Sequence, residues 1–178
     1  LHYRMLLGEP LTAVKDTEFR AYVAILAGGT VLLVGATWEP TGALLPGEGA
    51  ETVYTSLTTA FRYAVFQVVA IVTTTGFGTA DYELWAPLAS GLLFVLFFCC
   101  GMAGSTGGGM KVVRHVLLGK TAYREIRQLV HPKAILPIRL NDTVVDHTTI
   151  DNILSFVVLY FGLLFVGTLA VSAMGLDL

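Results

Sequence analysis

Four apolar runs separated by polar segments set the pattern of the chain. Three of them approach the roughly 20 apolar residues that a helix needs to cross the hydrocarbon core of a bilayer. These long runs cover residues 21–38, 85–102 and 153–174. The fourth run, at 57–72, contains Arg62 and Gln67, and a helix of that length would reach only about 24 Å. The pattern predicts three spans and, between the first two, a short re-entrant helix.

The composition is typical of a membrane protein. Hydrophobic residues make up 54% of the 178 positions and charged residues only 13%, whereas soluble domains carry about 25% charged residues. The mean hydropathy is +0.71. We therefore predict an all-α membrane protein. The adjacent Cys99 and Cys100 lie inside an apolar run, where they are better interpreted as small buried side chains than as a disulfide or a metal pair.

Charged residues are divided unevenly between the two sides that this topology defines. One side carries mainly basic residues: Arg4, Lys15, Arg20, Lys111, Arg114, Lys120, Arg124, Arg127, Lys133 and Arg139. The other side carries mainly acidic residues: Glu39, Glu48, Glu51, Asp81 and Glu83. The positive-inside rule then places the N-terminus and residues 111–148 in the cytoplasm, with the spans in the inner (plasma) membrane.

The basic segment has two interpretations. It can be a topology signal that also contacts lipid headgroups, or it can be a docking surface for a cytosolic partner. Ile126, Leu129 and Val130 favour the second interpretation slightly, because they would form one face of a short helix that Pro132 stops.

Between the short run and the second long run lies the sequence VTTTGFGTADY, at residues 72–82. Irregular backbone is tolerated at membrane depth only where it lines a wet cavity. Glycines permit the φ angles that turn carbonyls inward, and rings of carbonyl oxygens can replace the hydration shell of a cation. We therefore expect the filter of a cation pore here, although a plain turn between two apolar helices is an alternative. The residues concerned are Thr74, Thr75, Gly76, Phe77 and Gly78, with Asp81 and Glu83 at an outer mouth where they would concentrate cations.

A second glycine-rich stretch, GMAGSTGGGMKVVRH, occupies residues 101–115. Each glycine costs roughly 1 kcal/mol in a helix interior relative to alanine, which argues against an uninterrupted helix. A phosphate-binding P-loop is excluded, because Met110 stands where that motif requires lysine and no strand precedes it. Two interpretations remain: tight helix packing through Gly104 and Gly108, or an unwound intramembrane loop that lies under the filter and moves. Lys111 either places a positive charge near the ion path or marks the cytoplasmic boundary.

An arginine in a re-entrant helix is costly unless it is paired or wetted. Arg62 can neutralise an acid such as Glu51 or Asp81, or extend its side chain to the outer surface. We expect a supporting role, because a cation site repels a cationic side chain. Gln67 and Tyr63 are candidates for hydrogen bonds that brace the filter.

Three strings carry a resemblance to a known family. TTGFG at residues 74–78 is similar to a relaxed form of the potassium-channel filter pattern Thr-Val-Gly-Tyr-Gly. The strings FQVVAIVTTTGFGTADYELW and GMAGSTGGGMKVVRHVLL, together with REIRQLVHPKAILPIRL, resemble the TrkH/KtrB family of potassium transporters. In that family one chain carries four span–loop–span repeats, and two chains form a dimer. This sequence resembles the third repeat followed by the first span of the fourth.

The resemblance implies roles for both glycine-bearing segments. Potassium would be held at Thr74, Thr75, Gly76 and Phe77, with Gly76 as the selectivity glycine. The inner helix would break to form the gate, which comprises Gly104, Ser105, Thr106, Gly107, Gly108, Gly109 and Lys111. The implied partners are the remaining repeats of the same polypeptide, a second copy in a homodimer, the lipid bilayer and a cytosolic nucleotide-binding regulatory subunit near residues 111–148. Potassium is the only cofactor expected, with no organic group and no nucleic acid.

The predicted organisation has three parts. Residues 1–119 form a pore repeat, with a span at 21–38, a pore helix at 57–72, the filter at 74–78 and a broken inner helix at 85–118. Residues 120–148 form a cytoplasmic basic loop, and residues 149–178 contain the first span of the next repeat. Because the sequence begins with Leu and lacks a signal-peptide pattern, we expect a piece of a longer polypeptide.

The favoured function is movement of potassium down its electrochemical gradient. A sodium-permeable relative and a non-conducting membrane interaction subunit are the alternatives. An enzyme is not expected, because the sequence contains no nucleophile–base set, and His2, His115, His131 and His147 are scattered over flanks and loops.

Overall fold

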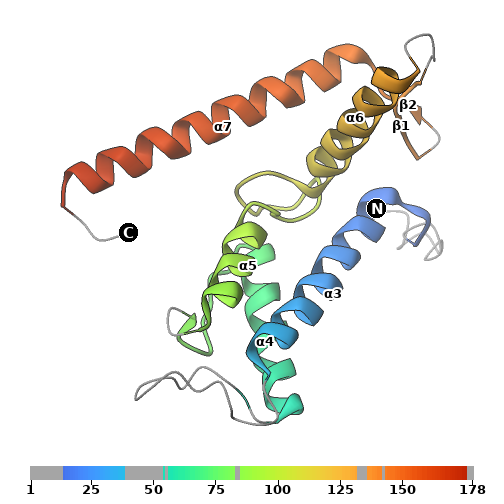
Figure 1. Cartoon of the computed structure of the whole chain (residues 1–178). Coiled ribbons are helices and arrows are strands. Elements are labelled where there is room, and N and C mark those ends of the chain that lie inside the picture. Colours follow the sequence, from blue (N-terminus) through green and yellow to red (C-terminus); the bar gives the residue numbers. More distant parts are fainter. Residues whose placement is uncertain are drawn as a thin grey trace. The chain divides into compact units, whose positions relative to one another are not determined.

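The computed structural model describes residues 14–38, 54, 56–82, 85–131, 136–141 and 143–175. In these ranges the chain is mostly helical (Figure 1). The elements are α3 (Thr17–Thr37), α4 (Leu57–Val72), α5 (Pro87–Phe97), α6 (Val112–Val130), β1 (Arg139–Leu140), β2 (Thr143–Val144) and α7 (His147–Ala173). The chain divides into two compact units, Leu1–His115 and Val116–Leu178. The boundary falls inside α6, and each unit is described by itself.

The first unit is built around a three-helix bundle in which α3, α4 and α5 pack on one another (Figure 1). Its core is apolar and consists of Leu33, Ala64, Val68, Val72, Trp85, Ala89, Leu93 and Leu96. Small residues let the helix backbones approach closely, as in other membrane bundles. A Cβ added at Gly29 of α3 would lie 3.0 Å from Leu96 Cδ1 and 3.4 Å from Val68 Cγ1. Gly29 is therefore the point where all three helices meet.

Substitution of Gly29 by leucine is expected to destabilise this bundle by about 1–3 kcal/mol, because overpacking a filled core displaces its neighbours. Gly28→Leu is the matched control, since nothing lies within 4 Å of a Cβ at Gly28. The measurement is the midpoint of thermal unfolding of the full-length protein in detergent. Equal midpoints for the two variants would contradict the packing described here.

Hydroxyl groups in the bundle satisfy their own helix. Thr30 and Thr37 are buried, and their hydroxyls donate to the carbonyls of Leu26 (2.7 Å) and Leu33 (2.9 Å). Such bonds to the preceding turn let a polar side chain enter an apolar core without an unpaired donor.

Among the described residues, two helices are long and apolar enough to cross a membrane, α3 and α7. The second long run, residues 85–102, does not form such a helix in the described part of the chain. Helix α5 begins with Pro87 at its N-terminus and ends at Phe97 after 11 residues, which is about 16 Å. The helix within this run is therefore shorter than residues 85–102, and the assignment of a span to the run stays a prediction. Apolar side chains continue beyond Phe97, but Gly101 adopts a left-handed φ of 43°, which no α-helix accommodates.

Both long helices begin earlier than the apolar runs, because an aspartate caps each one. Asp16 accepts hydrogen bonds from the N–H groups of Glu18 (2.7 Å) and Phe19 (3.2 Å). Asp146 accepts from the His147 N–H (2.9 Å) and from the Thr148 hydroxyl. The Thr148 hydroxyl holds the pKa of Asp146 below its usual value. This cap is therefore charged at neutral pH, and its contribution is lost only as the pH falls through that lowered pKa.

The second unit contains the C-terminal part of α6, a hairpin and α7. Strands β1 and β2 pair antiparallel, with Arg139 opposite Val144 and Leu140 opposite Thr143. Asn141 in the turn has a positive φ of 53°, which asparagine tolerates better than most residues. Residues 120–148 are thus not a loop throughout, because the amphipathic helix α6 extends to Val130 and the hairpin follows it.

Candidate functional site

The segment that follows α4 leaves the helix through a tight set of hydrogen bonds. The N–H groups of Thr75 and Gly76 both donate to the carbonyl of Ala70, at 3.0 and 3.3 Å. The Thr73 hydroxyl donates to the carbonyl of Val69 (2.6 Å) and lies 3.1 Å from the Thr75 hydroxyl. The last carbonyls of α4 are therefore satisfied locally, and the chain that follows is held against the helix end.

The backbone of this segment alternates in conformation. Thr74 has a φ of 59° and Gly76 a φ of 72°, whereas Thr73 is right-handed and Thr75 has no positive φ. A β-branched residue with positive φ is a genuine outlier, and such conformations cost about 1–3 kcal/mol and cluster at functional sites. Thr74 is therefore the first sign of a site in this chain.

All five residues predicted for the filter are exposed in this chain: Thr74, Thr75, Gly76, Phe77 and Gly78. Beside them lies a groove of about 660 Å³ along α4, lined among others by Arg62, Thr75 and Phe77. Asp81 is also exposed, and Glu83 lies outside the described residues.

The three residues expected to support the filter have different surroundings. They are Arg62, Tyr63 and Gln67. The Arg62 guanidinium carbon lies 5.0 Å from the ring centre of Tyr63, and Glu51 lies outside the described residues. The Tyr63 ring stacks on Tyr54 with 5.0 Å between centres. Gln67 is 2% exposed, and among the described residues its Oε1 has no hydrogen-bond partner. The expected hydrogen bond from Gln67 to the filter is therefore not found there.

The glycine-rich segment returns to the end of α4. The Gly101 N–H donates to the carbonyl of Val72 (3.0 Å), and the Val112 N–H donates to the carbonyl of Gly101 (3.0 Å). The Cys100 N–H donates to the carbonyl of Met110 (3.1 Å). Residues 101–111 thus form a loop whose two ends are bonded to each other and whose start is bonded to the last residue of α4.

The two glycine-bearing segments touch each other. A Cβ added at Gly107 would lie 2.7 Å from Thr74 Oγ1 and 3.6 Å from the Thr73 carbonyl oxygen. At Gly108 nothing lies within 4 Å of an added Cβ. Only a residue without a side chain fits against Thr74 at position 107. This contact joins residues 74–78 to the glycine-rich loop.

Two charged side chains bind the backbone of the loop. The Lys111 ammonium donates to the Ser105 carbonyl (2.9 Å), to the Ser105 hydroxyl (3.1 Å) and to the Gly107 carbonyl. Glu18, in the first turn of α3, accepts from the Ala103 N–H at 2.5 Å. No sequence pattern indicates this role of Glu18, because 85 positions separate it from Ala103 and no motif links the two.

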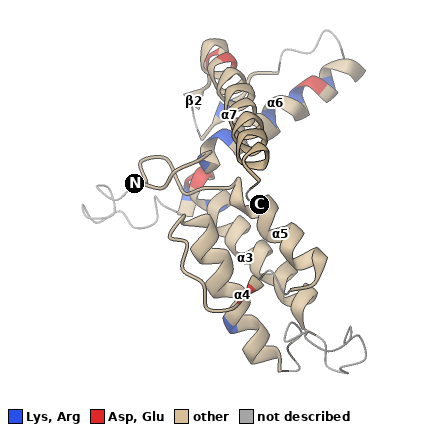
Figure 2. Ribbon diagram, turned by 90° about the vertical axis from the view of Figure 1, so that its left-hand side faces the viewer, with Lys and Arg blue, Asp and Glu red and all other residues tan. Residues whose placement is uncertain are grey.

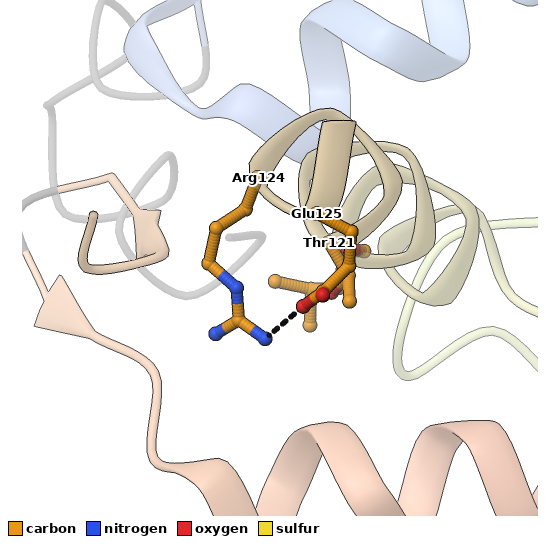
Figure 3. Close-up of polar contacts among 4 residues, drawn as sticks. Thr121, Arg124 and Glu125 are labelled. Atoms are coloured by element: carbon orange, nitrogen blue, oxygen red, sulfur yellow. Dashed lines mark hydrogen bonds and ion pairs between the residues drawn. The ribbon is translucent and has the colours of Figure 1, made fainter. Parts of the chain in front are cut away.

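Basic residues gather on α6, whereas the α3–α5 bundle carries few charges (Figure 2). Arg124 pairs with Glu125 at 2.8 Å (Figure 3), and Arg127 lies over the ring of Tyr123 at 5.2 Å. The side chain of Glu125 is 59% exposed and that of Arg124 15%, and among the described residues the buried Nε of Arg124 has no hydrogen-bond partner. The residues expected on one face of a short helix, Ile126, Leu129 and Val130, belong to α6 and are all exposed.

The profile of the TrkH family, described as a cation transport protein, matches residues 7–178. The chain belongs to the TrkH family. Membership places it among membrane transport proteins, in agreement with its two long apolar helices.

Individual TrkH relatives agree with this assignment. The Trk system potassium uptake protein TrkH of Salmonella typhimurium is 33% identical over 178 residues, which is 99% of this chain and 35% of the relative. The protein of the same name from Vibrio parahaemolyticus is 37% identical over 163 residues, covering 92% and 31%. The chain therefore spans about a third of the length of these TrkH relatives.

A solved TrkH structure shares the fold. The crystal structure of the potassium transporter TrkH from Vibrio parahaemolyticus matches with a TM-score of 0.73 at 35% sequence identity. The match covers 92% of this chain and 32% of that chain.

Proposed function

We propose that this chain supplies one pore-lining unit to a membrane protein that conducts potassium ions. The observation that carries the proposal is the alternating backbone at Thr74 and Gly76, positioned at the end of a helix too short to cross a bilayer. The names of the TrkH relatives, which are potassium uptake proteins, support the choice of ion.

The unit would work by replacing the hydration shell of the ion. Helices α4 and α5 are about 24 and 16 Å long, so residues 73–80, which follow α4 as irregular backbone, would lie at membrane depth. Such backbone is tolerated only where it lines a wet cavity. Carbonyl oxygens of residues 74–77, together with threonine hydroxyls, would coordinate a dehydrated potassium ion. Asp81 and Glu83 would raise the cation concentration at the outer mouth.

The glycine-rich loop would act as the gate of the same path. It contacts Thr74 through Gly107, so an ion that leaves the filter would meet the loop next. At Gly104 and Gly108 nothing lies within 4 Å of an added Cβ, which leaves the loop room to move. The remaining partners are part of the proposal: the other pore repeats, a second copy, a cytosolic nucleotide-binding subunit near the basic face of α6, and the inner membrane.

Rubidium uptake by cells that lack their own potassium transport tests the proposal. With the full-length protein, Gly76→Ser should lower rubidium uptake or its preference over sodium by about fivefold or more, because a side chain at positive φ costs about 1–2 kcal/mol and shifts the carbonyls. Gly91→Ser in α5, where an added Cβ meets nothing within 4 Å, is the control. If Gly76→Ser transports like the control, the segment is a packing turn and the non-conducting alternative gains support. Sodium flux equal to rubidium flux in the unsubstituted protein would favour the sodium-permeable alternative.

A further inference from the structure

The ammonium group of Lys111 binds three oxygen atoms of a single short segment. Two belong to Ser105, the carbonyl at 2.9 Å and the hydroxyl at 3.1 Å, and the third is the Gly107 carbonyl. A lysine ammonium has three donors, so these contacts use all of them. The Lys111 side chain therefore bonds back to residues 105 and 107 of the segment between α5 and α6; Figure 1 shows the course of this segment.

Backbone hydrogen bonds hold the two ends of the loop, and within it the Ser105 N–H donates to the Met102 carbonyl (3.0 Å). Gly104 and Gly109 have φ angles of 83° and 79°, and Ala103, Ser105 and Thr106 are exposed. Fixing the backbone of one residue costs about 1–2 kcal/mol of conformational entropy, and glycine loses the most. A segment of this composition needs specific tethers to keep a single conformation.

The two charged tethers act on backbone groups of opposite polarity. Lys111 binds carbonyl oxygens, and Glu18 binds the N–H of Ala103. Hydrogen bonds with one charged partner are roughly twice as strong as neutral ones. Glu18 fixes the early part of the loop to α3, and Lys111 fixes the part that contacts Thr74 through Gly107.

We infer that Lys111 is a positioning residue that latches residues 105–107 against the threonine–glycine segment. Its charge acts on the loop and not on a cytosolic or lipid partner. When the latch is released, the loop loses its fixed conformation and Gly107 leaves Thr74. The consequence for ion flux rests on the proposed function, whereas the latch itself does not.

Hydrogen–deuterium exchange of the full-length protein in detergent tests the latch directly. Lys111→Met keeps most of the aliphatic chain but removes the three donors, and we expect exchange of a peptide covering residues 101–111 to accelerate about fivefold or more. Exchange in α3 should stay unchanged. Lys15→Met is the matched control, because Lys15 is an exposed lysine in the same unit that makes no hydrogen bond to the loop within the described residues.

A second variant tests the latch if cells do not produce enough of the Lys111→Met protein. Ser105→Ala removes the hydroxyl acceptor and leaves the lysine in place, and we expect it to accelerate exchange of the same peptide about twofold. Exchange at the unsubstituted rate in Lys111→Met, or in Ser105→Ala if only that variant accumulates, overturns the latch. Equal acceleration in α3 also overturns it, because the effect would then be general unfolding. Faster loop exchange with unchanged rubidium uptake supports the latch and counts against the proposed gate.

Discussion

Replacing Gly107 by alanine is expected to reduce rubidium uptake by the full-length protein about tenfold or more. The new methyl group would lie 2.7 Å from Thr74 Oγ1, which is closer than a carbon and a hydroxyl oxygen can approach. To relieve this contact, the Thr74 side chain must rotate or the loop must move away from it. Overpacking of this kind costs about 1–3 kcal/mol, and the cost falls on the residues proposed to coordinate the ion.

Gly108→Ala provides the control for this prediction. It makes the same change one position further on, where an added Cβ has open space and the φ angle is not positive. We expect it to transport like the unsubstituted protein. Uptake reduced equally in both variants would mean that the loop needs glycine for flexibility and not for its contact with Thr74. Normal uptake in Gly107→Ala would contradict the contact.

An aspartate at the centre of α7 should abolish its membrane insertion. Leu163 lies near the middle of the apolar run at 153–174, and it is 65% exposed in this chain. An acidic residue at a helix centre raises the insertion free energy by about 2.5–3.5 kcal/mol, which is roughly a hundredfold in the insertion equilibrium. We therefore expect Leu163→Asp to leave most molecules uninserted.

The measurement is the fraction of molecules in which a tag after α7 reaches the far side of the membrane, read by glycosylation or protease protection. Thr149→Asp adds the same charge in the first turn of α7, where the helix dipole favours an acid, and it should insert normally. If Leu163→Asp inserts as well as Thr149→Asp, the rest of the protein and not lipid determines the position of α7.

The local features of the fold could be predicted from the sequence. Helix α4 covers Leu57–Val72, the same residues as the short apolar run, because polar residues and glycine end it on both sides. Membership of the TrkH family could also be predicted from the two glycine-bearing sequences, because these carry unusual residues at fixed spacing. The roles assigned to those strings stay predictions.

Contacts between distant residues could not be predicted in this way. The bond between Glu18 and Ala103 joins a helix start to a loop 85 positions later, and hydrophobic periodicity contains no information on such pairs. The positive φ of Thr74 could likewise not be predicted from the sequence, because threonine avoids that conformation unless its surroundings impose it. The end of α5 at Phe97 was missed since the apolar residues continue past it.

The aspartate caps of α3 and α7 have a consequence for how each helix stands in the bilayer. Asp16 and Asp146 each bond to the first turn of their own helix, and a carboxylate resists leaving the hydrated headgroup layer. Each cap therefore fixes the depth of its apolar helix segment in the bilayer. An α-helix advances about 1.5 Å and turns about 100° per residue. The depth of a residue in the bilayer and the direction in which its side chain points are therefore coupled. A single residue inserted after Asp146 would turn every later side chain of α7 toward a different neighbour.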